Sequence, residues 1–203
     1  MIELTNRQIQ RIKNYVSSSQ NESNDNDKLT SFELSTNRFT YQINSILRSN
    51  LETVNLEEYL TELDNAFENY ETTEETTVYR VCNYKEMLRY LENENYIDLG
   101  YMSTTSEPEN TQGFYQNQTF GYFPAFLKIN IPIGTNVLPL DNIANYQNNT
   151  YENEILIKRK AIFQVLDNRE IETNTNEELF GRENIEQIPR IRILEMNFIR
   201  YAE

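Results

Sequence analysis

The hydrophobic residues of this chain change their spacing near Thr76, and that change limits the possible folds more than any other feature. Before Thr76 they recur every three or four residues, whereas after it they form short or alternating runs. Helices in one part of a chain and strands in another are typical of an α+β fold. We therefore expect one domain over residues 1–203, with a helical N-terminal part at 1–75 and a mainly antiparallel β core at 76–203.

Three amphipathic helices are predicted in the N-terminal part. Thr5 and Gln8 have the spacing of a capping box at the start of the first helix. Asn55 is the expected N-cap of the third helix, because a short polar side chain there can accept a backbone hydrogen bond. The apolar residues that define the three helices are, in chain order, Ile9, Ile12, Tyr15 and Val16; Phe39, Ile43, Ile46 and Leu47; and Leu56, Tyr59, Leu60, Leu63 and Phe67.

The second part of the chain predicts strands separated by polar loops. Leu127, Ile129 and Ile131 alternate with other residues, so they lie on one face of a strand. A short helix is expected at 84–91, directly after the first strand. The predicted strands are 77–82, 100–105, 126–131, 137–140, 154–158, 161–166 and 190–200.

The charge of the chain limits what it can bind. With 18 Lys and Arg against 32 Asp and Glu, the formal net charge is −14. Such a chain repels polyanions over roughly a Debye length, and sequence-general binding to nucleic acid needs many cations. We therefore expect neither nucleic acid nor an anionic membrane as a partner. Two or three well-placed arginines could still hold a compact anionic cofactor.

The chain contains no His, and Cys82 is its single cysteine. Nucleophilic catalysis of the Ser-His-Asp or Cys-His type is therefore excluded. No metal site is expected, because the usual zinc ligands are missing. Cys82 cannot form an internal disulfide, and we expect it to be a small core residue on a strand.

The N-terminal residues lack the basic and apolar segments of a signal peptide. No apolar run approaches the ~18 residues that a membrane-spanning helix needs. We therefore expect a soluble protein, and we expect it to be a monomer.

Three motifs on three different predicted strands carry residues that could form a site. The sequence VYRV places Arg80 in an apolar strand, where an inward guanidinium needs an anion. GYMSTT places Ser103 and Thr105 on one strand face, and ENE places Glu152 and Glu154 two residues apart, so that both face the same way. Each motif alone has an ordinary explanation: a surface ion pair, a strand-end hydroxyl or a solvated strand entrance.

Together and in this order, the motifs resemble those of the Arg-Ser-Glu class of mono-ADP-ribosyltransferases, the group of C3-like exoenzymes and the catalytic domains of binary actin-modifying toxins. INSILR at 43–48 is similar to the family's helical I-N-x-x-L-R element, and Gly100-Tyr101 to its lead-in to Ser-Thr-Ser. The resemblance runs from about Thr5 to Leu166 and implies the ADP-ribosyltransferase fold, with a helical N-terminal layer and a two-sheet β core. It also implies NAD as the co-substrate and a protein as the acceptor.

The resemblance implies three catalytic residues. Glu154 would stabilise the positive charge that develops on the ribose, and Ser103 would hydrogen-bond and orient Glu154. Glu152 would face the acceptor; family members with Glu at this position generally modify arginine, so arginine is the expected acceptor. A toxin or effector of this kind would act in the cytoplasm or be delivered to a host cell by a non-classical route.

The resemblance also implies residues that bind NAD. Arg80 and Arg48 would contact the cofactor through guanidinium groups suited to phosphate. Val81 would offer its backbone to the nicotinamide amide, and Thr104 and Thr105 would brace the strand. The implied NAD-binding residues are Arg80, Arg48, Val81, Thr104, Thr105 and Phe120, the last as an aromatic ring for stacking.

The chain departs from the family pattern at three places, one of which is Asn149, where the family often has an aromatic residue three positions before the first acid. Thr105 replaces the third Ser of the triplet, which preserves the hydroxyl group. No Lys or Arg lies between Thr104 and Leu127, where the family often carries an Arg after an aromatic residue. Two alternatives stay open at this point: an NAD glycohydrolase with water as the acceptor, and a catalytically inactive binding module on the same fold.

Overall fold

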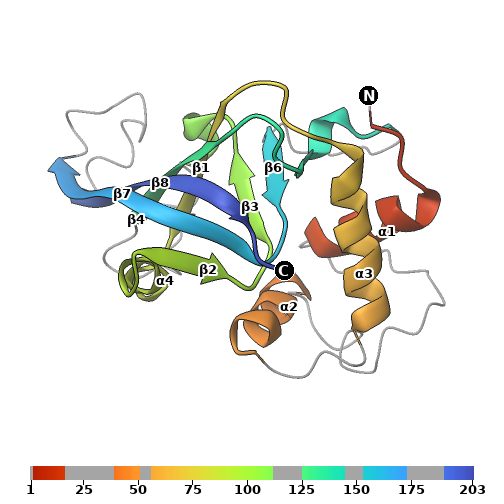
Figure 1. Cartoon of the computed structure of the whole chain (residues 1–203), viewed down its shortest axis with the longest axis horizontal. Helices are drawn as coiled ribbons and strands as arrows, with labels where there is room; N and C mark the ends of the chain where they lie inside the picture. The colour runs from red at the N-terminus through yellow and green to blue at the C-terminus, as the bar shows by residue number, and fades with distance from the viewer. Residues whose placement is uncertain (1, 17–38, 51–55, 112–124, 145–152, 173–189) are drawn as a thin grey trace.

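An eight-stranded sheet forms the centre of the structure (Figure 1). The computed structural model describes residues 2–16, 39–50, 56–111, 125–144, 153–172 and 190–203. The strand order is β2-β7-β8-β4-β1-β3-β6-β5, and of these neighbouring pairs β4 and β8 run parallel while the others are antiparallel. The strands are β1 (Thr76–Cys82), β2 (Asn95–Asp98), β3 (Met102–Thr105), β4 (Ala125–Ile131), β5 (Val137–Pro139), β6 (Glu154–Ile157), β7 (Ala161–Glu172) and β8 (Arg190–Tyr201).

The mainly antiparallel core is confirmed, and each predicted strand has a counterpart in the structure. β7 is longer than predicted and reaches Glu172, because polar residues continue its pairing with β8 beyond the apolar run. β2 was not predicted. It is a four-residue edge strand whose residues Asn95, Tyr96 and Ile97 are not buried, so no hydrophobic pattern marks it.

Hydrogen bonding joins the strands into one continuous sheet, so the expectation of two separate sheets needs correction. The junction between β1 and β3 is narrow, since Tyr79 and Thr105 are their one aligned pair. In contrast, β1 pairs with β4 along its whole length, from Thr76 to Cys82. The two parts of the sheet are therefore joined through a single aligned residue pair, between the strands that carry Arg80 and Ser103.

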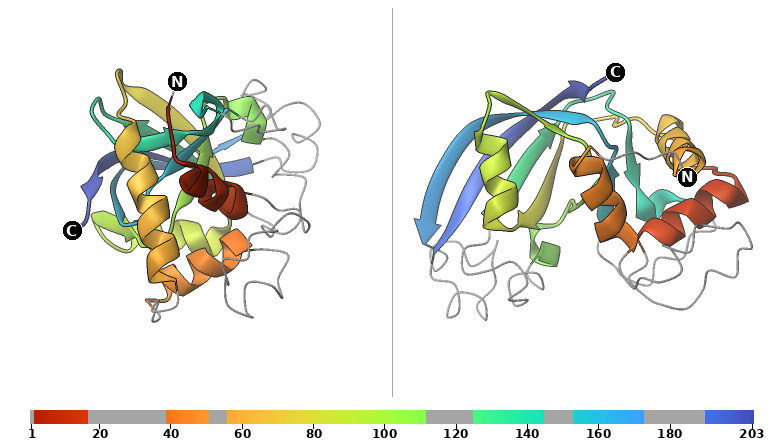
Figure 2. Two further views of the ribbon diagram at one scale, coloured as in Figure 1. Left: turned by 90° about the vertical axis from the view of Figure 1, so that its right-hand side faces the viewer. Right: turned by 90° about the horizontal axis from the view of Figure 1, so that it is seen from below.

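Helices α1, α2 and α3 lie together beside β6. Helix α4 lies beside β2 and β7, which are at the opposite end of the strand order (Figures 1 and 2). The helix predicted at 84–91 matches α4. Whether the N-terminal helices belong to a complete layer stays a prediction, because 17–38 and 51–55 lie outside the described residues. The helices are α1 (Asn6–Val16), α2 (Phe39–Arg48), α3 (Glu57–Ala66) and α4 (Tyr84–Leu91), and the 3-10 turns are Phe67–Asn69, Pro108–Thr111 and Leu140–Asn142.

The helix N-termini show which capping predictions were correct. The Thr5 backbone N–H donates to Gln8 Oε1 at 2.9 Å, and the Gln8 N–H donates to Thr5 Oγ1 at 3.2 Å, so the capping box of α1 is confirmed. The expected cap of α3 at Asn55 is wrong, because the capping position is Leu56, whose side chain makes no capping hydrogen bond. α4 is capped by Asn83, whose Oδ1 accepts from the Glu86 N–H at 2.9 Å.

Two hydrophobic cores lie on either side of β3 and β6. One combines the apolar faces of α1, α2 and α3 with Tyr101 and Leu156. The other combines the inner faces of the central strands with α4, and it includes Met102, Ile157 and the buried Cys82. Because side chains alternate along a strand, neighbouring residues of β3 and β6 contribute to different cores.

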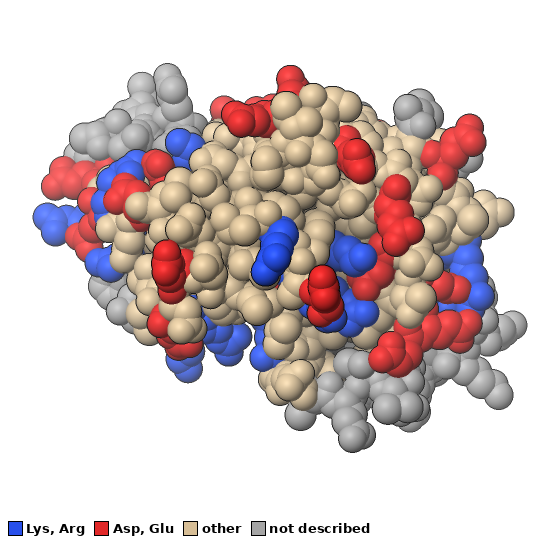
Figure 3. All heavy atoms as spheres, viewed as in Figure 1, with Lys and Arg blue, Asp and Glu red and all other residues tan. Residues whose placement is uncertain are grey.

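Side-chain charge is mixed on the face drawn in Figure 3, where Lys and Arg side chains are interspersed with Asp and Glu. Within the part of the chain that the structure describes, no helix combines the length and apolar character needed to cross a membrane.

We predict that replacing Leu60 of α3 by alanine lowers the free energy of unfolding by about 2–5 kcal/mol, because the change leaves a cavity in the helical core. Leu60 is fully buried, whereas Leu88 of α4 is 41% exposed, which makes Leu88→Ala the matched control. Urea unfolding followed by circular dichroism measures both variants. Equal losses in the two variants would contradict the assignment of this core.

Candidate functional site

Ser103 and Glu154 are held together by the pairing of β3 with β6. The register aligns Thr105 with Glu154 and Ser103 with Leu156, so the two functional side chains lie near each other on one face. Ser103 Oγ donates a hydrogen bond to Glu154 Oε1. Glu154 is only 9% exposed, so a hydroxyl from the neighbouring strand fixes the orientation of a nearly buried carboxylate. The hydrogen bond expected from the sequence is therefore present.

Thr104 and Thr105 secure the end of β3. Thr104 Oγ1 donates to the Ile155 carbonyl on β6 at 2.6 Å. Thr105 Oγ1 accepts from the Glu107 N–H at 3.1 Å, which closes the turn that follows the strand. Thr104 therefore ties β3 to β6, whereas Thr105 ties the end of β3 to the following turn, where its Oγ1 also lies 3.4 Å from Asn110 Nδ2.

Asn153 determines how the chain enters β6. Its φ of 47° lies in the left-handed region, which asparagine adopts more readily than most residues, and its carbonyl accepts from the Ser106 N–H at 3.1 Å. β6 begins at Glu154, so Asn153 is not part of the strand. The expectation that Glu152 and Glu154 face the same way stays a prediction. Glu152 itself lies outside the described residues.

Arg80 bridges the narrow junction between β1 and β3. Its Nη1 donates to the Ser103 carbonyl at 2.9 Å, so one residue accepts from Arg80 and donates to Glu154. Its Nη2 lies 3.4 Å from Glu86 Oε1 on α4. The Arg80 side chain is 21% exposed, and its Nε is buried without a hydrogen-bond partner in the described structure. A buried unpaired donor is uncommon in native proteins, and it leaves this guanidinium incompletely bonded.

Arg48, at the end of α2, forms a two-pronged ion pair with Asp98. Arg48 Nε donates to Asp98 Oδ1 at 2.7 Å, and Nη2 donates to Oδ2 at 2.9 Å. Burial alone would lower the pKa of the Arg48 guanidinium, but the charge and hydrogen bonds of Asp98 outweigh burial and raise it. Arg48 Nη2 also lies 3.8 Å from Glu86 Oε1, the oxygen that Arg80 approaches. The two arginines are therefore brought together, and the fork of Arg48 is already filled by a carboxylate.

Asn44 fixes α2 against the segment that leads into β3. Its Oδ1 accepts from the Tyr101 N–H at 2.8 Å, and its Nδ2 donates to the Tyr15 hydroxyl at 2.8 Å. Burial raises the pKa of Tyr15, so its hydroxyl stays protonated and donates to the Tyr101 carbonyl at 3.4 Å. A Cβ at Gly100 would lie 2.7 Å from Asn44 Oδ1 and 3.0 Å from Arg48 Nε. Glycine is therefore required here so that α2 can approach the backbone.

Sequence reasoning missed several of these residues. It named neither Asp98 nor Glu86, because an acidic residue carries no pattern that reveals a buried arginine partner. Asn44 lay within the quoted INSILR motif, so its position was visible but its contacts were not. Tyr15 gave no signal beyond its place on an apolar helix face.

Val81 and Phe120 are the remaining residues expected to bind NAD. The Val81 side chain is 5% exposed and packs with Phe126 and Ile193, in a cluster separate from the one that contains Cys82. Only its backbone could serve the expected role. Phe120 lies outside the described residues, so its role stays a prediction.

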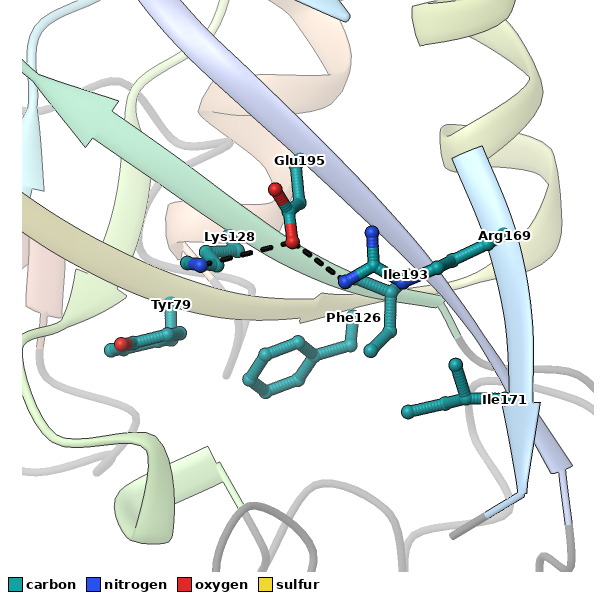
Figure 4. A pocket seen from close by; sticks show the side chains of 7 residues that line it. All are labelled: Tyr79, Phe126, Lys128, Arg169, Ile171, Ile193 and Glu195. Atoms are coloured by element: carbon teal, nitrogen blue, oxygen red, sulfur yellow. Dashed lines mark hydrogen bonds and ion pairs between the residues drawn. The ribbon is translucent and has the colours of Figure 1, made fainter. Parts of the chain in front are cut away.

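A shallow hollow of about 210 Å³ lies elsewhere on the sheet (Figure 4). Tyr79 and Phe126 form part of its lining, and Glu195 on its rim pairs with Arg169 at 2.7 Å and with Lys128 at 3.7 Å. Because adjacent strand residues point to opposite faces, Tyr79 faces away from Arg80. Among the described residues, none of those expected at the site lines this hollow.

The fold resembles those of known bacterial toxins. Plx2a, an ADP-ribosyltransferase toxin from Paenibacillus larvae, matches with a TM-score of 0.58 and 15% identity, over 97% of this chain and 87% of that chain. C3stau2 from S. aureus matches with a TM-score of 0.57 and 16% identity, over 97% and 88%. BECa, an ADP-ribosylating toxin of C. perfringens, matches with a TM-score of 0.60 and 16% identity, over 97% of this chain and 44% of that chain.

The sequence comparisons add a family assignment. No curated protein matches the chain at a significant level. The family model described as ADP-ribosyltransferase exoenzyme matches residues 3–185, which is most of the chain and includes the strands that carry Arg80, Ser103 and Glu154. The chain therefore belongs to the ADP-ribosyltransferase exoenzyme family.

Proposed function

We propose that this protein is a mono-ADP-ribosyltransferase that cleaves NAD, releases nicotinamide and transfers ADP-ribose to an arginine of an acceptor protein. The main support is the connection through Ser103, whose hydroxyl holds Glu154 and whose carbonyl accepts from Arg80. Family membership supports the reaction class. The similar proteins C3stau2 and BECa were solved with NAD and NADH, respectively, which supports NAD as the co-substrate.

Glu154 is proposed as the catalytic carboxylate. NAD supplies the ADP-ribosyl group with nicotinamide as the leaving group, and positive charge develops on the ribose as their bond breaks. A fixed carboxylate at ~4 Å, with an effective dielectric near 20, stabilises such a charge by about 4 kcal/mol. That corresponds to roughly a thousandfold in rate. Ser103 contributes by holding Glu154 in place before the reaction, so little reorganisation is needed.

Arg80 and Arg48 are proposed to hold the diphosphate of NAD. The residues present fit this group, because Arg80 has a buried Nε without a partner in the described structure and guanidinium donors match phosphate oxygens. Arg48 Nη2 and Arg80 Nη2 both approach Glu86 Oε1, at 3.8 and 3.4 Å, so one oxygen atom already lies within reach of both side chains. Val81 would contact the nicotinamide amide through its backbone, and Phe120 would stack on the cofactor.

Glu152 is proposed to select the acceptor. A guanidinium is cationic and a poor nucleophile, so a carboxylate that binds it and takes up its proton favours attack on the ribose. This part of the proposal rests on the ENE sequence and on the family pattern, in which Glu at this position accompanies arginine modification.

We expect Glu154→Gln to lower nicotinamide release from NAD by roughly a thousandfold, because the variant keeps the shape but loses the charge. Labelled NAD with bacterial and animal cell lysates measures transfer, and chromatography measures nicotinamide. The matched control is Glu170→Gln, a carboxylate on β7 that pairs with Arg190 at the surface. A Glu154→Gln protein that keeps more than a tenth of wild-type cleavage would exclude Glu154 as the catalytic carboxylate.

Ser103→Ala should lower kcat by about a hundredfold while changing the KM for NAD little, because the carboxylate loses its fixed orientation but the arginines remain. Steady-state kinetics of NAD cleavage measure this separation of kcat from KM. Thr76→Ala removes a hydroxyl that, within the described residues, bonds to the nearby Glu74 carbonyl, so we expect it to behave as wild type. An increase in KM without loss of kcat would contradict the positioning role of Ser103.

Glu152→Gln should abolish transfer to protein while leaving most NAD cleavage intact, because water can still accept ADP-ribose. Mass spectrometry of the acceptor modified by the wild-type enzyme identifies the modified side chain, which we expect to be arginine. If the Glu152→Gln enzyme still labels arginine at the wild-type rate, the proposed acceptor mechanism is incorrect.

A further inference from the structure

Asp98 is a buried carboxylate of the site region that accepts four hydrogen bonds. It ends β2, is 1% exposed and accepts hydrogen bonds from side chains of two helices and from the backbone ahead of β3. Two of its bonds come from Arg48, as described above, and Tyr90 of α4 donates its hydroxyl to Oδ2 at 3.3 Å. The Gly100 N–H donates to Oδ1 at 2.9 Å. A carboxylate removed from water to this extent is stable only when its charge is paired and its oxygens are bonded.

The pair with Asp98 determines where the Arg48 guanidinium lies. The two parallel hydrogen bonds fix the plane of the fork as well as its position. The Arg48 Nη2 that donates to Asp98 also lies 3.8 Å from Glu86 Oε1, and Arg80 approaches the same Glu86 oxygen at 3.4 Å. These two distances exceed those of ordinary charge-assisted hydrogen bonds. Glu86 therefore holds the two arginines loosely, whereas Asp98 holds Arg48 tightly.

The same carboxylate also shapes the approach to Ser103. Asp98 Oδ1, which accepts from Arg48 Nε, also accepts from the Gly100 N–H two residues later in the chain. The next residue, Tyr101, is bonded through its N–H to Asn44 of α2. One oxygen atom thus links the arginine at the end of α2 to the segment that leads into β3.

We propose that Asp98 is a positioning residue of the ADP-ribosyltransferase site: without contacting NAD, it sets the Arg48 guanidinium beside Arg80 and aligns the entry to β3. The inference rests on the proposed function, in which Arg48 and Arg80 bind the diphosphate. Asp98 thereby raises the affinity for NAD indirectly, although its own negative charge would repel a phosphate group.

Asp98→Asn tests this assignment, because asparagine has nearly the same shape but lacks the charge and the second acceptor oxygen. We expect the Kd and the KM for NAD to rise by about ten- to a hundredfold. Loss of a residue that orients a binding side chain has an effect of this size at metal sites, where it has been measured. The kcat for NAD cleavage should change much less. Calorimetry with NAD, steady-state kinetics and thermal unfolding give the three readouts.

Tyr90→Phe is the matched control, because it removes a different donor to the same carboxylate and leaves the Arg48 pair intact. We expect its Kd for NAD to equal that of the wild type. In an Arg48→Ala background, Asp98→Asn should cause no further rise in KM, since the side chain that Asp98 positions is gone. A purely structural role would instead lower the unfolding temperature and raise KM in both backgrounds.

Arg48→Lys keeps the inference testable if Asp98→Asn does not fold. Lysine retains the positive charge but cannot form the two-pronged pair, so KM should rise as for Asp98→Asn. If wild-type protein binds NAD but Asp98→Asn or Arg48→Lys binds it equally well, the inference fails and the proposed function stands. If the wild-type protein neither binds nor cleaves NAD, the proposed function fails first and this inference fails with it.

Discussion

The arrangement of the site depends on the narrow junction between β1 and β3. The two strands share one aligned pair, Tyr79 with Thr105, so backbone pairing alone does not fix their separation further along. The Arg80 side chain spans this gap and bonds to the Ser103 carbonyl, while the Ser103 hydroxyl bonds to Glu154 on the next strand. A cation, a hydroxyl and a carboxylate from three strands are therefore connected through one residue.

Most of the architecture was predictable because it follows from local patterns. Alternating apolar residues identified β4, and the Thr5 and Gln8 spacing identified the capping box. The part that failed depends on long-range pairing. β2 is a polar edge strand that is recognisable only from its pairing with β7, and the division into two sheets ignored the single pair that joins β1 to β3.

The candidate site shows the same division between local and long-range information. The order of the motifs brought Arg80, Ser103 and Glu154 to notice, although each motif alone has an ordinary explanation. The residues that hold them were hidden, since Asp98 and Glu86 are ordinary acids in a chain with 32 Asp and Glu. The left-handed conformation of Asn153, directly before Glu154, was equally hidden.

The charge balance around the arginines determines how an anion can bind there. Arg48 and Arg80 are matched by Asp98 and Glu86, so this group contributes no net positive charge within a chain of formal charge −14. Long-range attraction therefore cannot deliver affinity for a phosphate group. The affinity must come from donors at short range, and the loosely held Glu86 oxygen lies between the guanidinium groups that would provide them. An anion with better geometry can replace that oxygen, because the contacts it makes are long and weak.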